Sequence, residues 1–304
     1  MRNRQAAFQI RHLLPPGLFF CLFLAACSPK PLQSTPQPAT LTPRASLTAS
    51  PTVPTQTPSP TASPTLDPTP ICNGLVGQVM QVEFDTTRMY EPFKMSVYLP
   101  PCYTLYLEKH YPVLYLFHGI YYSNDQWIRL GVTRVADRLI NSGEIPPFII
   151  VMPYDSNARE PTNSAFDEVF IQEAVSYIDA NYRTIPQAAG RAVGGLSRGA
   201  GWAIHFGLTH PELFGAIGAH SPVLFWEDAP ELDKWLAAIP RSGLPRISLD
   251  IGDRDPNRDS AELLENALTD KNIPFDLHLN SGYHTEEYWS QHVEDYIRWY
   301  AAGW

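Results

Sequence analysis

Residues 192–208 read AVGGLSRGAGWAIHFGL, and positions 195–199 within them form the pattern Gly-x-Ser-x-Gly. A short apolar run precedes the pattern and a helix-like stretch follows it, so Ser197 is predicted to lie on a sharp turn from a strand into a helix. Glycine two residues before and two residues after the serine leaves room for such a turn, because glycine has no Cβ. A serine placed in this way is typical of the nucleophile of a hydrolase.

The sequence also supplies partners for this serine. A serine hydroxyl is a weak nucleophile at neutral pH, so it needs a base, and the base needs a carboxylate to orient it. His284 is the predicted base because it follows the last predicted strand. Asp255 is the predicted acid because the chain has just left a strand there, with Asp253 and, less favoured, Asp250 within that strand as alternatives. Whichever of these three aspartates is the acid, the order along the chain is Ser, Asp, His, which this type of hydrolase requires.

Four further histidines are interpreted as packing or loop residues rather than bases, and they are His118, His205, His210 and His220.

The oxyanion of a tetrahedral intermediate needs two hydrogen-bond donors. The backbone N–H of Arg198, at the start of the predicted helix, is one candidate. The other is expected from the loop after the strand at residues 113–117, at Ile120. The side chain of Arg198 is not required for this role and is expected to form a salt bridge.

Four aromatic residues near these positions are candidates to line a substrate cleft, although packing in the core or at its rim is the default interpretation in a chain with this many aromatic residues. They are Tyr121, Tyr122, Trp127 and Trp226. Tyr121 and Trp127 are the preferred substrate contacts.

The pattern of apolar runs predicts an α/β fold. Besides the run before Ser197, strands are expected at residues 77–84, 93–99, 113–117, 147–152, 214–219, 246–251 and 275–279. Helices are expected at residues 132–141, 167–181, 198–208, 260–270 and 286–300. This alternation predicts a mostly parallel sheet covered by helices on both faces, with an antiparallel pair at one edge. The candidate polar residues all follow strands, so they should meet at the carboxyl edge of the sheet.

The first 26 residues are expected to be a signal peptide rather than part of the fold. Arginines at positions 2, 4 and 11 precede an apolar stretch that is too short and too interrupted to span a bilayer. The stretch ends in LAAC at positions 24–27, which resembles a bacterial lipobox. We therefore expect cleavage before Cys27, lipidation of Cys27 and a membrane-anchored lipoprotein outside the cytoplasm. An ordinary signal peptide with an incidental Cys27 is the alternative.

Residues 27–70 are expected to join this anchor to a folded domain. Twelve prolines, ten threonines and six serines fall between residues 28 and 70, a composition that cannot bury a core and predicts a disordered spacer. Residues 71–304 then suit a single domain.

The charge and the motifs exclude some function classes. A formal net charge of −9 argues against nucleic-acid binding. No metal-ligand spacing and no glycine-rich phosphate loop is present, so no metal and no cofactor is expected.

Cys72 and Cys102 are the two cysteines of the predicted domain. In an exported protein such a pair predicts a disulfide. The alternative is that both thiols are free and buried.

Several segments together resemble a known family. They are VYLPPCY at 97–103, YPVLYLFHG at 111–119, YIDANYRT at 177–184 and GLSRG at 195–199. They resemble the esterase branch of the α/β-hydrolases, which includes esterase-D-like enzymes, feruloyl and acetyl-xylan esterases, enterochelin-esterase-type enzymes and mycolyltransferases. The resemblance spans about residues 77–304 and implies the α/β-hydrolase fold.

The resemblance also implies site residues, namely Ser197 as nucleophile, Asp255 as acid and His284 as base. Two positions depart from the family pattern. Residues 120–124 read IYYSN where the family often has a glycine-rich loop, and Cys102 stands where the family commonly has glycine.

We therefore expect a serine carboxylesterase that cleaves small-acyl or aromatic-acyl esters, with a carbohydrate as a candidate alcohol, through an acyl-enzyme. One alternative is an acyltransferase that uses the same three residues. The other, less favoured because Ser, Asp, His and both glycines are retained, is a non-catalytic surface-binding domain.

Overall fold

The computed structural model describes residues 74–156 and 159–304. The predicted signal peptide, lipidation site Cys27, spacer and Cys72 lie outside the described residues. Eight strands form one sheet. They are β1 (Gln78–Phe84), β2 (Phe93–Leu99), β3 (Val113–Phe117), β4 (Ile149–Pro153), β5 (Arg191–Leu196), β6 (Ala216–His220), β7 (Arg246–Gly252) and β8 (Asp276–Asn280).

The strand order is β1-β2-β4-β3-β5-β6-β7-β8. β1 pairs antiparallel with β2, and β2 pairs antiparallel with β4, whereas every other neighbouring pair is parallel. The predicted antiparallel pair at one edge and the mostly parallel sheet are therefore both confirmed. In such a sheet the loops that follow the parallel strands share one edge.

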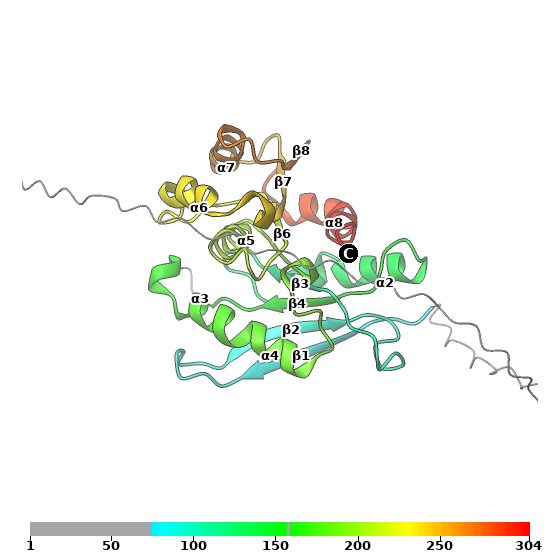
Figure 1. Ribbon diagram of the computed structural model, residues 1–304. Helices are drawn as coiled ribbons and strands as arrows, with labels where there is room; N and C mark the ends of the chain where they lie inside the picture. Colours follow the sequence, from blue (N-terminus) through cyan, green and yellow to red (C-terminus); the bar gives the residue numbers. More distant parts are fainter. Residues whose placement is uncertain (1–73, 157–158) are drawn as a thin grey trace, which may run out of the picture. The chain divides into compact units, whose positions relative to one another are not determined.

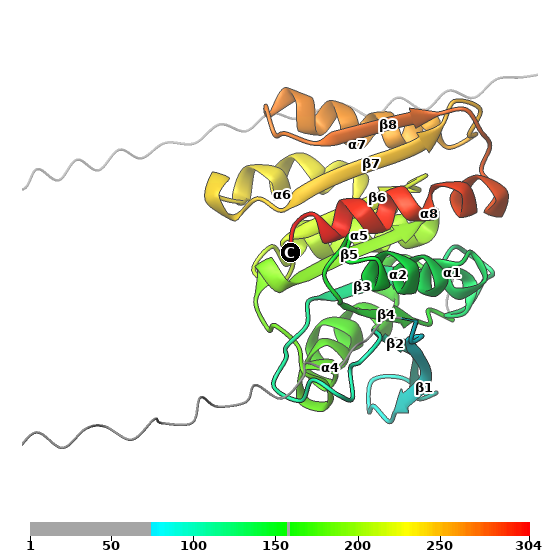
Figure 2. The same ribbon diagram turned by 90° about the vertical axis from the view of Figure 1, so that its right-hand side faces the viewer.

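Helices cover both faces of the sheet (Figures 1 and 2). One face carries α1 (Gln126–Arg129), α2 (Val132–Asn141) and α8 (Glu286–Ala301). The other carries α3 (Ala165–Val169), α4 (Val175–Asn181), α5 (Arg198–Thr209), α6 (Leu232–Ala238) and α7 (Arg258–Asp270). Across residues 74–156 and 159–304, no helix combines the length and apolar character needed to cross a membrane.

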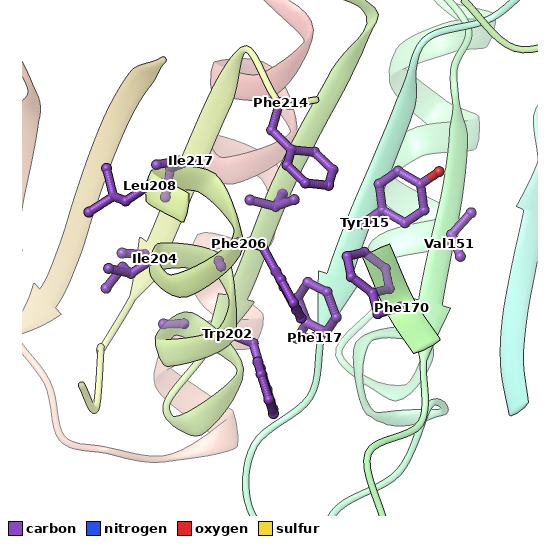
Figure 3. Close-up of a cluster of buried hydrophobic side chains, with 14 of the residues drawn as sticks. Tyr115, Phe117, Val151, Phe170, Trp202, Ile204, Phe206, Leu208, Phe214 and Ile217 are labelled. Atoms are coloured by element: carbon purple, nitrogen blue, oxygen red, sulfur yellow. The ribbon is translucent and has the colours of Figure 1, made fainter. Parts of the chain in front are cut away.

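Side chains of the central strands alternate between the two faces, as the period of two requires. On β3, Val113, Tyr115 and Phe117 join the core beneath α5, whereas Leu114 and Leu116 face the core beneath α2 and α8. Figure 3 shows the core beneath α5, where aromatic rings from β3 meet rings from α5 and from the segment before α4. Phe117 and Phe206, for example, have ring centroids 5.4 Å apart.

Two glycines of the sheet allow the last helix to dock closely. Gly194 of β5 and Gly218 of β6 are register partners, and a Cβ on either would overlap the hydroxyl of Tyr300 in α8.

The hydroxyl of Tyr300 lies 3.0 Å from Nε2 of His220, and burial lowers the pKa of His220 to about 3. His220 is therefore an uncharged core residue, as its sequence position suggested.

The predicted elements differ from the observed ones in two respects. The helix predicted at residues 167–181 consists of α3, a π-helical segment (Phe170–Ala174) and α4. The short helices α1 and α6 were not predicted, because four and seven residues show too little periodicity. The remaining boundaries agree within about three residues, which is usual for helix and strand ends.

A buried histidine holds the loop after β6 in place. Nδ1 of His205, in α5, lies 3.1 and 3.0 Å from the two carboxylate oxygens of Asp228, and Nε2 lies 3.6 Å from Asp167. Burial by itself would lower the pKa of His205, but hydrogen bonds and charge from Asp167 and Asp228 outweigh it and raise the pKa to about 9. A charged His205 thus ties α3 and the loop after β6 to α5.

This arrangement predicts a loss of stability in mild alkali. The pKa of folded His205, about 9, lies above the ordinary value of 6.5, so its stabilisation is complete below about pH 6.5 and is lost as pH rises through about 9. We expect the free energy of unfolding to fall by up to about 3 kcal/mol over this range. Urea unfolding at about pH 6 and about pH 10 measures the difference.

His205→Gln should flatten this pH dependence. His210→Gln is the matched control, because His210 follows α5 at the surface and pairs only with exposed Glu212 among the described residues. Equal flattening by both variants would contradict the assignment to His205.

Candidate active site

Ser197 lies in the turn between β5 and α5, with φ 56° and ψ −125°. The backbone of Ser197 is held by four hydrogen bonds. The Ser197 N–H donates to the carbonyl of His220 (2.9 Å), and the Ser197 carbonyl accepts from Ala200 (3.0 Å), Gly201 (3.3 Å) and Val223 (3.2 Å). A positive φ is unfavourable for a residue with a side chain, so these bonds hold a strained conformation.

The two flanking glycines are required by close backbone contacts. A Cβ on Gly195 would overlap the carbonyl of Gly199, so the two ends of the pentapeptide touch. A Cβ on Gly199 would overlap the carbonyl oxygens of Phe117 and His118 at the end of β3. Since all these obstacles are backbone atoms, no side-chain movement could relieve them. The predicted reason for both glycines is therefore confirmed.

Three polar side chains from three different loops meet beside this turn. Nε2 of His284 lies 2.8 Å from Oγ of Ser197, and Nδ1 of His284 lies 2.8 Å from Oδ2 of Asp255. Because the carboxylate can only accept, Nδ1 carries the proton and Nε2 is left to accept from the serine hydroxyl. These distances are those of a nucleophile, a base and an orienting acid.

Asp255 has a buried carboxylate with several donors. Burial by itself would raise its pKa, but hydrogen bonds from His284, the backbone N–H of Asn257 and the Ser221 hydroxyl outweigh burial and lower the pKa. The Asn257 N–H donates to Oδ1 at 2.8 Å, and the Asn257 amide group lies 3.2 Å from Nδ1 of His284. Asp255 is therefore ionised at neutral pH and able to stabilise a protonated His284.

The two alternative acids contact other groups. Asp250 is buried on the α8 side of the sheet and accepts from Tyr288 (2.9 Å), Tyr296 (2.6 Å) and Asn280 (3.1 Å). Asp253 accepts from the backbone N–H of Gly282 at 2.8 Å, on the exposed side of the same turn. Of the three candidates, Asp255 is the one hydrogen bonded to His284.

The loop after β3 also lies beside the serine, since a Cβ on Gly119 would come within 3.6 Å of the Cβ of Ser197. The Gly119 N–H donates to Oε1 of Gln126 (2.8 Å), and the Gly119 carbonyl accepts from Tyr122 (3.2 Å), which closes a tight turn. Ile120 lies inside this turn. Its N–H makes no hydrogen bond to the described residues, and an oxyanion donor should be unpaired before substrate arrives.

Asp155, which follows β4, connects the two regions that carry the candidate oxyanion donors. Its Oδ2 accepts from Arg198 Nη2 (3.0 Å), Arg198 Nε (3.2 Å) and Trp202 Nε1 (2.9 Å). Its backbone N–H donates to Nε2 of His118 at 3.0 Å, and Nδ1 of His118 donates to the Gly119 carbonyl at 2.8 Å. One residue thereby ties the start of α5 to the loop that contains Ile120. The salt bridge expected for the Arg198 side chain is the one to Asp155.

His118 acts as a neutral link in this network. Burial lowers its pKa, and the two partners require a proton on Nδ1 and a lone pair on Nε2. The expectation that His118 is a loop residue rather than a base agrees with this position.

The prediction that Trp127 contacts substrate is corrected by the structure. Trp127 is 1% exposed, its indole N–H donates to the carbonyl of Phe117 at 2.9 Å, and its ring meets His220 and Tyr296 edge-on. It belongs to the core between α1 and α8. Tyr121 is 92% exposed at φ 67°, so its role as a substrate contact stays a prediction.

Four residues of the site were not predicted from the sequence: Asp155, Asn257, Ser221 and Gln126. Each belongs to the site through partners far away in the chain or through backbone groups, and no local pattern marks such contacts. Position offered one signal: Asp155 follows a predicted strand, as Ser197 and Asp255 do.

Cys102 is buried at φ 63°. Its predicted partner Cys72 lies outside the described residues, so the disulfide stays a prediction. Within residues 74–156 and 159–304, no group of three or more histidine, cysteine or acidic side chains is placed to hold a metal ion.

Comparison with known proteins agrees with this geometry. The family described as "Putative esterase" matches residues 86–302. An endo-1,4-beta-xylanase/feruloyl esterase of Xylanibacter ruminicola is 33% identical over 153 residues, which are 47% of this chain and 21% of that protein. The uncharacterized protein YjcH of Bacillus subtilis is 28% identical over 236 residues, 70% of this chain and 93% of that protein.

Among solved structures, a ferulic acid esterase is 25% identical, with a TM-score of 0.69 over 76% of this chain and all of that one. The matched residues include every strand from β2 to β8 and all three side chains that meet beside the nucleophile turn. The chain therefore belongs to this esterase family and has the α/β-hydrolase fold.

Proposed function

We propose that this protein is a serine carboxylesterase in which Ser197 is the nucleophile, His284 the general base and Asp255 the orienting acid. The observation that carries the proposal is the continuous hydrogen-bonded line from Ser197 Oγ through both ring nitrogens of His284 to Asp255. This line of hydrogen bonds begins at Ser197, whose backbone is strained. A serine with a purely structural role would not require a strained backbone.

In the first half-reaction, Ser197 Oγ attacks the ester carbonyl carbon while its proton moves to Nε2 of His284. The negative charge on the former carbonyl oxygen is stabilised by the N–H groups of Arg198 and Ile120. The carbon–oxygen bond to the alcohol then breaks, and His284 gives its proton to the departing alkoxide. An acyl group remains on Ser197.

In the second half-reaction, a water molecule attacks the acyl carbon and gives a proton to His284. The bond to Ser197 Oγ breaks, the proton returns to Oγ, and the carboxylic acid leaves. Asp255 stays ionised throughout and stabilises the imidazolium form of His284 in both halves.

For the substrate, we propose an ester of an aromatic or small carboxylic acid whose alcohol part is a carbohydrate. The relatives named as feruloyl or ferulic acid esterases support the aromatic acid. The first of them combines its esterase with an endo-xylanase, as its name says, which supports the carbohydrate.

For the location, we propose export and membrane anchoring through a lipidated Cys27, with a disulfide between Cys72 and Cys102. The lipobox-like LAAC sequence and the proline-rich spacer support the anchor, and the export signal supports the disulfide. Membrane fractionation of Cys27→Ser cells tests the anchor: the variant should leave the membrane fraction, and unchanged fractionation would contradict the proposal.

Ser197→Ala should abolish hydrolysis of p-nitrophenyl acetate and methyl ferulate, because no other hydroxyl is aligned with His284 among the described residues. Stability should change by no more than about 1 kcal/mol, since the variant removes one hydrogen bond. Initial rates and thermal unfolding of both proteins measure the two quantities. Retained turnover together with a large loss of stability would contradict the assignment of the nucleophile.

Asp155→Asn should lower kcat by about tenfold or more while KM changes little, because Arg198 loses its charged partner and the oxyanion donors lose their fixed position. The affinity for an arylboronic acid, which becomes a tetrahedral anion on Ser197, should fall in parallel with kcat.

Trp202→Phe is the matched control for that variant. It removes a third hydrogen bond to the same oxygen of Asp155 but leaves the bonds from Arg198 in place. Its kcat should stay close to that of the unmodified protein. Equal losses in both variants would show that Asp155 acts only through general stability.

A further inference from the structure

Exposed aromatic side chains gather at one edge of the sheet. In residues 74–156 and 159–304, the exposed aromatic residues are Tyr90, Tyr121, Tyr122, Trp226 and Tyr283. We call these five residues the aromatic row. Each lies in a loop at the edge that carries Ser197: the β1–β2 loop, the loop after β3, the loop after β6 and the loop after β8.

The strand order places the nucleophile within this row. β5, which leads to Ser197, lies between β3, which leads to Tyr121, and β6, which leads to Trp226. Four strand spacings separate β3 from β8, or on the order of 20 Å. The opposite edge differs in kind, because its exposed apolar side chains are aliphatic: Leu75, Val76, Leu105 and Leu107. The loops at the Ser197 edge also expose one aliphatic side chain, Ile120, but all the exposed aromatic rings of the described residues lie at this edge.

Tyr121 occupies a backbone conformation that disfavours a side chain. Its φ of 67° lies in the left-handed region, within the turn closed by the Tyr122–Gly119 hydrogen bond, where glycine would be unstrained. Its side chain is 92% exposed, so burial does not compensate for the strain. A strained residue with an exposed ring beside a nucleophile points to a contact made by the ring.

Trp226 lies on a loop that is otherwise firmly attached. Its neighbour Phe225 is buried, Asp228 bonds to His205, and the carboxylate of Glu227 accepts from the hydroxyl of Thr162 at 2.5 Å. Trp226 is nevertheless 84% exposed. The loop therefore holds an exposed indole in a fixed place.

Tyr283 is also held in place. The Arg254 guanidinium lies 4.3 Å from the centre of its ring, and Nη1 of Arg254 donates to its hydroxyl at 3.2 Å. Rings positioned in advance in this way bind a ligand at a smaller entropic cost than mobile ones.

We infer that the aromatic row is a binding surface for an extended, uncharged polysaccharide that passes Ser197 with sugar rings on both sides of it. The C–H faces of sugar rings stack on aromatic faces, and tyrosine hydroxyls can hydrogen bond to sugar hydroxyls. This inference rests on the proposed function, since it makes the polysaccharide the carrier of the ester.

The charge and the composition of the row favour an uncharged glycan over two other partners. Single-stranded nucleic acids also stack on aromatic rings, but they need a positively charged groove, and this chain has a formal net charge of −9. A membrane-binding surface would add leucine or phenylalanine to the aromatic residues, and four of the five residues here are tyrosine.

Affinity electrophoresis of the full chain carrying Ser197→Ala tests the inference. The gels contain xylan, glucomannan or mixed-linkage β-glucan, and a parallel assay uses phosphatidylcholine vesicles. We expect at least one of these glycans to retard the protein. Adding Trp226→Ala or Tyr121→Ala should weaken that binding by about tenfold. The matched control, Leu105→Ala with Leu107→Ala on the opposite edge, should bind as tightly as the parent.

Absence of binding to all three glycans would overturn the inference, as would equal weakening by the control. Binding to vesicles through Trp226 and Tyr121 without glycan binding would also overturn it and would assign the row to a lipid surface. Because the protein used carries Ser197→Ala, the result does not depend on catalysis. The two claims can fail separately. If the Ser197→Ala variant binds a glycan but the chain with Ser197 intact hydrolyses no ester, the proposed function is rejected and the glycan-binding inference stands.

Discussion

The close approach of the nucleophile turn to the end of β3 is the constraint on which the site depends. Gly199 lies against the carbonyl oxygens of Phe117 and His118, and Gly195 lies against Gly199, so the chain can turn from β5 into α5 within one residue. Ser197 adopts a positive φ to make this turn. Backbone hydrogen bonds to His220, at the end of β6, and to Val223, in the loop after it, hold Ser197 in place. The same contact places the start of α5 beside the loop of Ile120, the two segments that carry the proposed oxyanion donors.

The remaining interactions fix the orientation of what this turn brings together. Asp155 joins Arg198 to His118, and His118 joins Asp155 to the backbone of Gly119. On the other side, Asn257 and Ser221 help to keep Asp255 ionised beside His284. Below the turn, Tyr300 fits over Gly194 and Gly218, so that α8 supports β5 and β6 directly. The parallel strands explain why side chains so far apart in sequence converge, because their carboxyl ends share one edge.

Much of this site could be predicted from the sequence, because the relevant signals are local. The glycines around Ser197 indicate the turn, and the positions of Asp255 and His284 after strands indicate the shared edge. The prediction for Trp127 was wrong because a hydrogen bond to the backbone of Phe117 holds its ring in the core, and no local sequence pattern indicates such a bond. Asp155 was missed because its partners lie 37 to 47 residues away, and no periodicity encodes such pairs. The π-helical segment before α4 was missed because its apolar pattern is that of an ordinary helix.

The central claim is that Ser197 is made nucleophilic by His284 and Asp255. Reaction with a fluorophosphonate, followed by intact-mass measurement and peptide mapping, tests it most directly. One phosphonyl adduct per chain is expected, located on Ser197. Labelling should be much slower in Asp255→Asn. In contrast, Asp253→Asn, which changes the neighbouring carboxylate bonded to Gly282, should react at nearly the original rate. An adduct on another residue, or labelling of Ser197 at the same rate in Asp255→Asn, would contradict the account.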